Sequence, residues 1–545
     1  MKKIILLCTF CWGMLVPGAR ACTSFLAGRN ATIDGSTFIT YAADSHTLYG
    51  ALKFIPAARH PKNSTMEIRE WDTNKLLGHI PQVEYTYKVV GNMNEHQLSI
   101  TESTWGGRPE LIDTTGIIDY GSLMYIALQR AKTAREAITV MTDLVSEYGY
   151  YSSGESFSIA DPEEVWIMEM IGKGPQNQGA VWVAVRIPDD CIAAHANQSR
   201  IHKFPLDDKE NCLYSPDVIS FAREQGYFNG LNKDFSFADA YAPADFGALR
   251  GCEARVWSFY NRFNSSMGKY LSYLNGKSKE YLPLYIKPDK KLSVQDMKDA
   301  MRDHFEGTPF DMTQDIGAGP FKCPYRFRPM TFKVDSIEYT NERAVATQQT
   351  AFTLVAQMRS WLPNAIGGIL WFGVDDTNTC IYVPLYACLN EVPECYSESN
   401  GSMYDLSWTS AFWIHNWVAN MAYSRYDQMI EDIRPVQKDI ETTFNVQQPV
   451  IEKVANDLYR NDPVAAIRFL NAYSVAQAQQ TTVQWKKLGE FLLVKYLDGN
   501  RKKEKGGHFL ENGYGLPADP DFPGYSEEYY RAVAKDAGDR LKVAF

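Results

Sequence analysis

The chain has 545 residues and a formal net charge of −10 at pH 7, and 45% of its residues are hydrophobic and 13% aromatic. This composition can bury large cores, and the acidic balance disfavours nucleic acid and anionic membrane surfaces as partners. The length predicts one large domain with appendages, or two to three domains.

Residues 1–21 have the layout of a secretory signal peptide. An early pair of lysines is followed by an apolar run over residues 4–16, and the small residues Ala19 and Ala21 stand at the third and first places before a cleavage point. The run is too short to span a bilayer as a stable anchor. We therefore expect cleavage after Ala21, export to the periplasm or the outside, and Cys22 as the first residue of the working protein.

A cysteine at a newly made N-terminus carries two reactive groups. The α-amine titrates near about 7.7–8.0 and a free thiol near about 8.5, so the amine can accept the thiol proton at neutral pH without a histidine. The thiolate can then attack an amide carbonyl, while neighbouring groups lower the thiol pKa and hold the oxyanion. On this hypothesis, removal of the leader also activates the protein.

A lipid anchor is the alternative explanation for a cysteine at this place. Bacterial lipoproteins usually have Leu at the third position before the cysteine, whereas this chain has Ala19, and Arg20 is unusual there. The alternative would make the chain an exported, lipid-anchored binding protein for peptides or sugars. A free Cys22 or a diacylated one would distinguish the two.

Two short strands and a helical segment are expected next. The strands lie within residues 23–41 and flank an Asp-Gly turn. Residues 122–148 are predicted helical, because a capping box begins at Thr133, apolar residues follow at helical spacing and Gly149 stops the pattern.

Two pairs of apolar runs then predict further strands. Residues 164–170 and 180–187 form one predicted hairpin, and residues 367–376 and 379–386 form a second pair. Strands that come as hairpins, separated by helices, favour antiparallel sheets with helices packed outside.

From about residue 425 the pattern changes to helices. Asp462 and Pro463 suit the cap and first turn of a helix that is predicted to run to Gly499. Residues 426–545 are therefore predicted to be a helical C-terminal appendage, with a tail rich in Gly, Pro and aromatic residues that wraps the surface in loops.

Eight cysteines remain after the predicted leader. Cys380, Cys388 and Cys395 lie close together in the sequence, and export would permit a disulfide among them, although spacing alone does not fix the pairing. No Cys-x-x-Cys pair follows residue 21, which disfavours a zinc ribbon.

The segment that follows the predicted cleavage point carries a specific pattern. Residues 22–45 read CTSFLAGRNATIDGSTFITYAADS, which starts with Cys-Thr, passes through Asp-Gly-Ser-Thr and reaches Asp-Ser. In this pattern the sequence resembles the C69 dipeptidases, a family of N-terminal nucleophile (Ntn) hydrolases. The resemblance continues, in the expected order and over most of residues 22–390, in five further blocks: residues 91–103, 193–201, 302–313, 319–329 and 370–386.

The resemblance implies an α+β fold of a particular kind. Members of the family have a four-layer αββα sandwich, in which two antiparallel sheets lie face to face with helices on both outer sides. We assign this catalytic domain to residues 22–425. The family also implies hydrolysis of dipeptides through an acyl-enzyme on the N-terminal cysteine, with no metal ion or organic cofactor.

Four residues match functional positions of the family. Cys22 matches the nucleophile, Asp44 the aspartate that orients its amine and thiol, Asn197 an amide donor to the oxyanion, and Arg255 a basic residue that favours the thiolate. Without the resemblance, Asp44 would equally suit a turn cap, Asn197 a structural or glycosylated asparagine, and Arg255 a surface arginine. The chain departs from the family at Tyr41, where relatives often have arginine, and this puts the substrate range in doubt.

Competing classes lack their motifs. The sequence contains no His-Glu-x-x-His of a metalloprotease and no Gly-x-Ser-x-Gly of a serine hydrolase, and His195 and His202 are too far apart to indicate a metal site. The alternative within the Ntn group is an amidase that acts on N-acyl amino acids or bile-salt-like conjugates. The expected partners are dipeptide substrates, and a homo-oligomer remains open.

Overall fold

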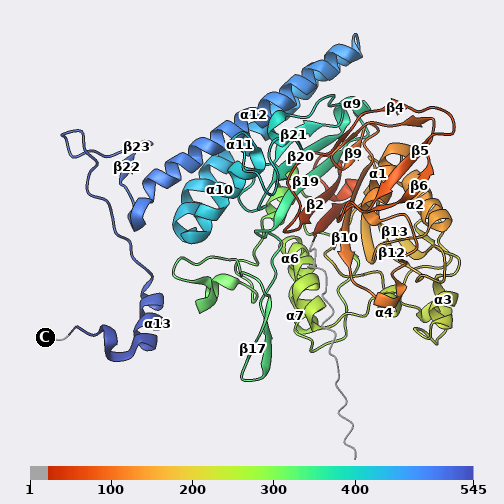
Figure 1. The fold of residues 1–545 in the computed structure, drawn as a ribbon, viewed down its shortest axis with the longest axis horizontal. Coiled ribbons are helices and arrows are strands. Elements are labelled where there is room, and N and C mark those ends of the chain that lie inside the picture. Colours follow the sequence, from red (N-terminus) through yellow and green to blue (C-terminus); the bar gives the residue numbers. More distant parts are fainter. Residues whose placement is uncertain (1–21, 544–545) are drawn as a thin grey trace, which may run out of the picture.

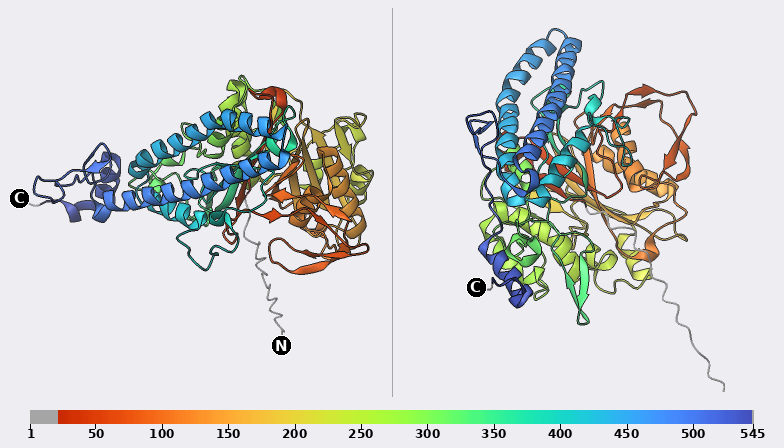
Figure 2. Two further views of the ribbon diagram at one scale, coloured as in Figure 1. Left: turned by 90° about the horizontal axis from the view of Figure 1, so that it is seen from above. Right: turned by 60° about the vertical axis from the view of Figure 1, so that its left-hand side comes forward.

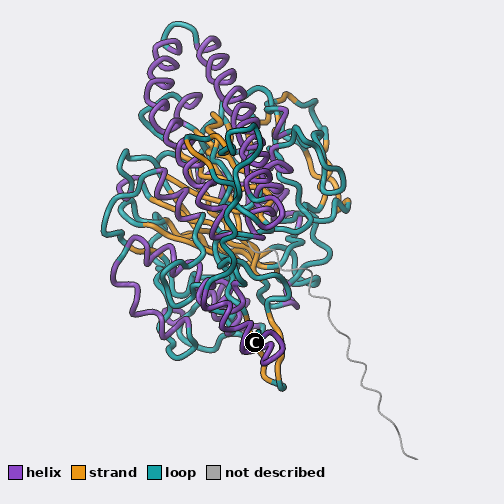
Figure 3. The backbone as a smooth tube through the Cα atoms, turned by 90° about the vertical axis from the view of Figure 1, so that its left-hand side faces the viewer, coloured by secondary structure: helices purple, strands orange, loops and turns teal. Residues whose placement is uncertain are grey.

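The structure is a computed structural model that describes residues 22–543, so the predicted leader lies outside the described residues. Strands run through the middle of the molecule and helices surround them (Figure 1, Figure 3). The mixture of helices and strands agrees with the predicted α+β class.

Two antiparallel sheets form the centre of the described part of the chain. The first has the spatial order β16 (Tyr285–Ile286), β14 (Ile192–His195), β1 (Ser24–Ala27), β2 (Thr37–Asp44), β19 (Thr350–Met358), β20 (Ile369–Val374) and β21 (Val383–Tyr386). The second has the order β15 (Cys212–Tyr214), β13 (Ala180–Arg186), β12 (Val165–Gly172), β11 (Gly154–Ala160), β10 (Ser99–Trp105), β9 (Met93–Asn94), β8 (Val89–Val90) and β3 (Phe54–Ile55).

Strand β2 shows how these layers stack. Its side chains alternate between two faces, as they must in a strand. Thr40 Oγ1 lies 3.1 Å from the sulfur of Met301 on helix α8 (Val294–Met301), whereas the next residue, Tyr41, reaches Glu102 on β10 of the other sheet. At this point helix α8 therefore covers one face of the first sheet, and the second sheet covers the other face.

The remaining helices distribute over the outsides of the two sheets. Helices α1 (Tyr120–Arg130) and α2 (Ala134–Tyr148) contact strands of the second sheet. Helices α6 (Ala254–Phe263), α10 (Ala411–Ser424), α11 (Tyr426–Tyr459) and α12 (Pro463–Lys495) contact strands of the first sheet. The shorter helices are α3 (Val218–Glu224), α4 (Phe237–Tyr241), α5 (Phe246–Ala248), α7 (Leu271–Leu274), α9 (Asn364–Gly367) and α13 (Glu527–Ala537).

Four small two-stranded sheets complete the strands of the described chain. They pair β4 (Ala58–Arg59) with β7 (Tyr85–Thr86), β5 (Thr65–Arg69) with β6 (Leu76–Pro81), β17 (Thr331–Val334) with β18 (Ile337–Thr340), and β22 (Glu504–Lys505) with β23 (His508–Phe509).

Most of the predicted local elements are confirmed. Strands β1 and β2 flank the Asp-Gly turn, where Gly35 has φ +86°, and β12–β13 and β20–β21 are antiparallel neighbours. The segment 122–148 is different, because it contains two helices. Thr133 is extended and its hydroxyl accepts the Glu136 amide at 3.2 Å, so the predicted cap starts a second helix.

The C-terminal helices α11 and α12 lie side by side as a long antiparallel pair (Figure 2). Asp462 caps α12 as predicted, since its carboxylate accepts the Ala465 amide at 3.0 Å, and the helix ends at Lys495 before a short turn to Gly499. Both helices also contact β21, and their apolar side chains join the main core. Within residues 22–543, no helix is both long and apolar enough to cross a membrane.

The expectation of a disulfide among Cys380, Cys388 and Cys395 is wrong for this structure. All eight cysteines of the described chain are free thiols. The three side chains are buried in separate surroundings: Cys380 Sγ lies 3.5 Å from the Thr377 carbonyl oxygen, and the Cys395 thiol is hydrogen-bonded by Thr482. Each thiol is packed as a small apolar group, which is a common role for a buried cysteine.

The buried aspartate that follows β20, Asp375, gives a prediction about stability. Asp375 is 1% exposed, its Oδ1 accepts the Asn416 amide at 2.9 Å, and its Oδ2 is buried without a hydrogen bond among the described residues. Burial raises the pKa of Asp375 to about 8, although the hydrogen bond from Asn416 opposes this. Because the folded-state pKa is above the unfolded value, the neutral carboxyl favours folding at low pH, and that contribution is lost as the pH rises towards 8.

We therefore expect Asp375→Asn to be more stable than the parent at pH 8 by about 2 kcal/mol, and to lose this advantage at pH 4. Asparagine has nearly the same shape, carries no charge and tolerates the positive φ of +64° at this residue. Thermal melting of both proteins from pH 4 to 8 measures the difference. A gap in melting temperature that does not widen with pH would contradict this explanation.

Candidate active site

Cys22 lies directly before β1, in the space between the two sheets, and is only 4% exposed. Two backbone hydrogen bonds fix it there, from Thr23 N to Ala42 O at 3.3 Å and from Ala42 N to Thr23 O at 3.0 Å. These bonds place the cysteine beside the end of β2. Its Sγ lies 3.4 Å from Glu102 Oε1 and 3.8 Å from the hydroxyl of Tyr41.

Arg255 connects Cys22 and Thr23 to Asn197. Its guanidinium donates to the Cys22 carbonyl oxygen and the Thr23 hydroxyl, both at 2.7 Å, and to Asn197 Oδ1 at 2.9 Å. The side chain is 1% exposed, and burial lowers its pKa to about 10, so it stays charged at neutral pH. The expected basic residue is thus close to Cys22, although its hydrogen bond to Cys22 goes to the carbonyl oxygen and not to the thiol.

Asn197 is held in a left-handed backbone conformation with φ +62°. Its Nδ2 donates to the Thr104 carbonyl oxygen at 2.6 Å, and its backbone amide donates to the Ser103 hydroxyl at 3.2 Å. Asparagine tolerates such a conformation better than most residues do. Together with Arg255, these contacts join Asn197 to β10 and to the segment that carries Cys22.

His195 links the two sheets next to Asn197, a structural role that the sequence did not indicate. Its two ring nitrogens lie 2.6 Å from the Ser103 hydroxyl and 2.7 Å from the Ser158 hydroxyl, between the two sheets. Burial lowers its pKa to about 3, so the imidazole is neutral at ordinary pH. Its only ring-nitrogen partners in the described chain are these two hydroxyls, which makes it a structural residue and not the base for Cys22.

Asp44 ends β2 beside the cysteine. Its Oδ1 accepts the Thr350 hydroxyl at 2.6 Å and its Oδ2 accepts a guanidinium N–H of Arg343. Burial raises the pKa of Asp44, and the charge of Arg343 opposes this shift. A backbone hydrogen bond from Asp44 also reaches the Cys22 thiol.

Arg343 supplies a guanidinium group beside Asp44, although position 41 holds a tyrosine and not the arginine of many relatives. Tyr41 stands where relatives often have arginine, and its hydroxyl donates to Glu102 and does not pair with Asp44. The guanidinium beside Asp44 comes instead from Arg343, which lies about three hundred residues further along the chain and adjoins β19. No local motif marked this residue.

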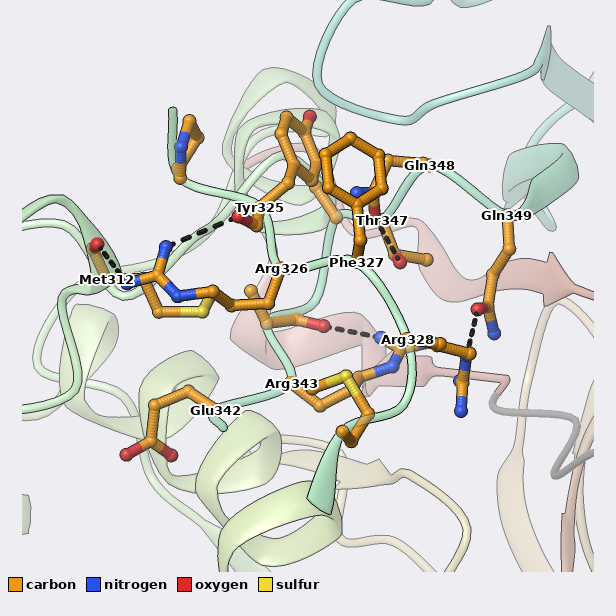
Figure 4. A pocket seen from close by; sticks show the side chains of 14 residues that line it. Met312, Tyr325, Arg326, Phe327, Arg328, Glu342, Arg343, Thr347, Gln348 and Gln349 are labelled. Atoms are coloured by element: carbon orange, nitrogen blue, oxygen red, sulfur yellow. Dashed lines mark hydrogen bonds between the residues drawn. The ribbon is translucent and has the colours of Figure 1, made fainter. Parts of the chain in front are cut away.

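A small pocket of about 80 Å³ adjoins Arg343. Figure 4 shows Arg326, Arg328 and Arg343 around it, with Arg328 Nε donating to Gln349 Oε1 at 3.0 Å. Burial, and then the charge of Arg343, lower the pKa of Arg328. The surroundings of Asp44 on this side are therefore cationic.

The thiol itself is kept protonated in this structure. Burial raises the pKa of Cys22 well above its usual value, and the negative charges of Glu102 and Asp44 raise it further. Within residues 22–543, no group of three His, Cys, Asp or Glu side chains is arranged to hold a metal ion. The chemistry available at this place is that of one thiol among carboxylates, an amide and two guanidinium groups.

Comparison with known proteins shows the family to which this chain belongs. The family model described as Peptidase family C69 matches residues 21–439, and the chain belongs to that family. This confirms the resemblance drawn from residues 22–45 and the later blocks.

Several relatives carry related names. A "Probable dipeptidase" of Latilactobacillus sakei is 27% identical over 425 residues, which cover 74% of this chain and 82% of that protein. A "Probable dipeptidase" of Salmonella dublin is 26% identical over 388 residues, covering 67% and 81%. A "Probable dipeptidase B" of Streptococcus pyogenes serotype M1 is 23% identical over 512 residues, covering 88% and 94%.

Proposed function

We propose that this protein is an exported cysteine dipeptidase whose nucleophile is Cys22, made N-terminal when residues 1–21 are removed. One observation carries the proposal: the Cys22 thiol is buried between two sheets, and Asp44, Asn197 and Arg255 all converge on the same few residues around it. The names of the relatives support dipeptides as substrates.

The architecture supports the Ntn-hydrolase type. Two antiparallel sheets contact each other through β1, β2, β10 and β11, and helices pack on their outer sides. The candidate nucleophile stands at the start of β1 between the sheets, which is where a four-layer αββα sandwich would place an N-terminal nucleophile. Helices α11 and α12 would form the C-terminal extension of this catalytic domain.

The proposed reaction uses both reactive groups of Cys22. The free amine takes the thiol proton and the sulfur attacks the peptide carbonyl carbon, so a C–S bond forms and the carbonyl oxygen becomes an oxyanion. The Asn197 amide is assigned to this oxyanion. The C–N bond then breaks as the amine returns its proton to the leaving nitrogen, and water hydrolyses the thioester to restore the thiol.

The electrostatics support activation by leader removal. While residue 21 precedes Cys22, its nitrogen is an uncharged amide, and Glu102 and Asp44 hold the thiol in its protonated form. A free amine would place a proton acceptor within hydrogen-bonding distance of the thiol. When it is protonated, the same amine would place a positive charge there. That charge would offset the two carboxylates and lower the thiol pKa.

The test combines a mass measurement with a substrate panel. The active protein should begin at an unmodified Cys22 and should turn over dipeptides. Turnover of N-acyl amino acids but not of dipeptides would instead identify an amidase. A diacylated Cys22 in a protein without hydrolase activity would support a lipid-anchored binding protein.

A further inference from the structure

Glu102 is a buried carboxylate beside the candidate nucleophile. It lies on β10 and is 1% exposed. Two side-chain donors, the hydroxyl of Tyr41 and the thiol of Cys22, both approach Oε1. Oε2 is buried and accepts no hydrogen bond among the described residues.

An unpaired carboxylate oxygen in such a place is costly. A buried acceptor that loses water without gaining a donor destabilises the folded protein, and does so more strongly when it is charged. The cost is recovered if a bound cation donates to Oε2. The two guanidinium groups described above have other acceptors: Arg255 donates to the Cys22 carbonyl oxygen and Asn197, and Arg343 donates to Asp44.

A peptide with a free N-terminus would bring such a cation to this point. Its ammonium nitrogen is two bonds from the first carbonyl carbon, a separation of about 2.5 Å. When Cys22 Sγ approaches that carbon, the ammonium must lie within a few ångströms of the sulfur. Glu102 Oε1 is 3.4 Å from Sγ, so the carboxylate stands within reach of the ammonium.

An aromatic cavity of about 260 Å³ is linked to this carboxylate through Tyr41. Its rings are those of Tyr49, Trp71, Tyr125, Phe352 and Phe372. The ring of Phe352 meets Tyr41 edge-on, with centroids 5.6 Å apart, and Tyr41 in turn donates to Glu102. Burial and the charge of Glu398 raise the pKa of Tyr125 in the cavity wall, and the charge of Glu102 adds to this shift.

The cavity is suited to an apolar side chain. Trp71 stacks on Tyr125 with centroids 5.0 Å apart, and Phe352 stacks on Phe372 at 5.8 Å. At the same cavity, Lys53 and Glu398 pair with each other at 3.3 Å, so their charges are mutually satisfied. Mostly aromatic linings with a few fixed polar groups are typical of small-molecule sites.

We propose that Glu102 binds the α-ammonium of the substrate and that the aromatic cavity takes the side chain of the same first residue. The substrate class is then peptides with an unblocked N-terminus and a large apolar first side chain. This inference rests on the proposed function and names the groups that select the substrate. It also separates a dipeptidase from an amidase, since an N-acyl substrate has no ammonium for Glu102.

Glu102→Gln tests the ammonium contact. The variant should lower kcat/KM for a dipeptide such as Phe-Ala by roughly 10- to 100-fold, mainly through KM, because a hydrogen bond to a charged group is lost. The ratio of kcat/KM for Phe-Ala to kcat/KM for N-acetyl-Phe-Ala should fall towards one, because any effect of the lost charge on the Cys22 thiol acts on both substrates alike. The ratio is measured within one variant and is independent of the folded fraction.

Two controls accompany this variant. Glu490→Gln makes the same chemical change on an exposed face of α12 and should leave the ratio at the parental value. If Glu102→Gln instead lowers kcat equally for blocked and free substrates, Glu102 serves the amine of Cys22 and the inference is overturned. An unchanged ratio would overturn it as well.

Trp71→Ala tests the cavity. Because Trp71 is partly exposed at the cavity wall, its truncation should lower kcat/KM for Phe-Ala relative to Ala-Ala by about tenfold. Equal effects on both substrates would remove the cavity from the side-chain assignment.

Cys22→Ala distinguishes a failure of the proposed function from a failure of the inference about Glu102. If it is inactive while Glu102→Gln keeps the parental substrate ratio, only this inference fails. If Cys22→Ala remains active, the proposed function fails and the inference fails with it.

Discussion

Cys22→Ala is expected to lower dipeptide turnover by about 10³-fold or more, to the limit of detection. The substitution removes the sulfur atom that attacks the peptide carbonyl in the proposed reaction. The loss of one buried sulfur atom should leave the fold intact, because Thr23 and Ala42 hold this segment through backbone bonds. Turnover of a dipeptide by the purified variant is the measurement.

Cys22→Ser is the matched variant. A hydroxyl occupies nearly the same space but is far less acidic than a thiol, so we expect activity close to that of Cys22→Ala. The mass of each variant must show the same first residue as the parent, since otherwise a failure of processing would imitate a loss of chemistry. Activity near the parental value in either protein would mean that the nucleophile lies elsewhere.

Asp44→Asn is expected to lower kcat by about 10²-fold. The carboxylate accepts from Thr350 and Arg343 and stands where the family places the residue that orients the nucleophile. The amide keeps the shape but removes the negative charge that faces the Arg343 guanidinium and the Cys22 thiol.

The pH profile distinguishes catalysis from stability in this variant. Burial raises the pKa of Asp44, so the parent should lose activity on the acid side at a pH above that of an ordinary aspartate, as the carboxyl takes up a proton. Asp44→Asn cannot titrate there and should show a flatter acid limb. Thr350→Val, which removes one hydrogen bond and no charge, should reduce kcat much less and keep the acid limb. A steep acid limb in Asp44→Asn would assign the titration to another group.

Local structure followed closely from local sequence. An Asp-Gly turn between apolar runs is sufficient to predict β1 and β2, and Asp462-Pro463 is sufficient to predict the start of α12, because turns and caps depend on a few adjacent residues. The segment 122–148 differs from its local prediction. Its helical periodicity is real, but the extended cap at Thr133 divides it into two helices.

The sequence by itself determined the peptidase family, the strands that flank the first turn, and Cys22, Asp44, Asn197 and Arg255 as candidates. Only the tertiary structure decided how these residues meet, that Glu102, His195 and Arg343 stand behind or beside them, and that the three clustered cysteines do not pair. The physical reason is that the site lies between two sheets. Its contacts join residues that are 58 to 299 positions apart along the chain, and no local pattern of side chains encodes such a contact.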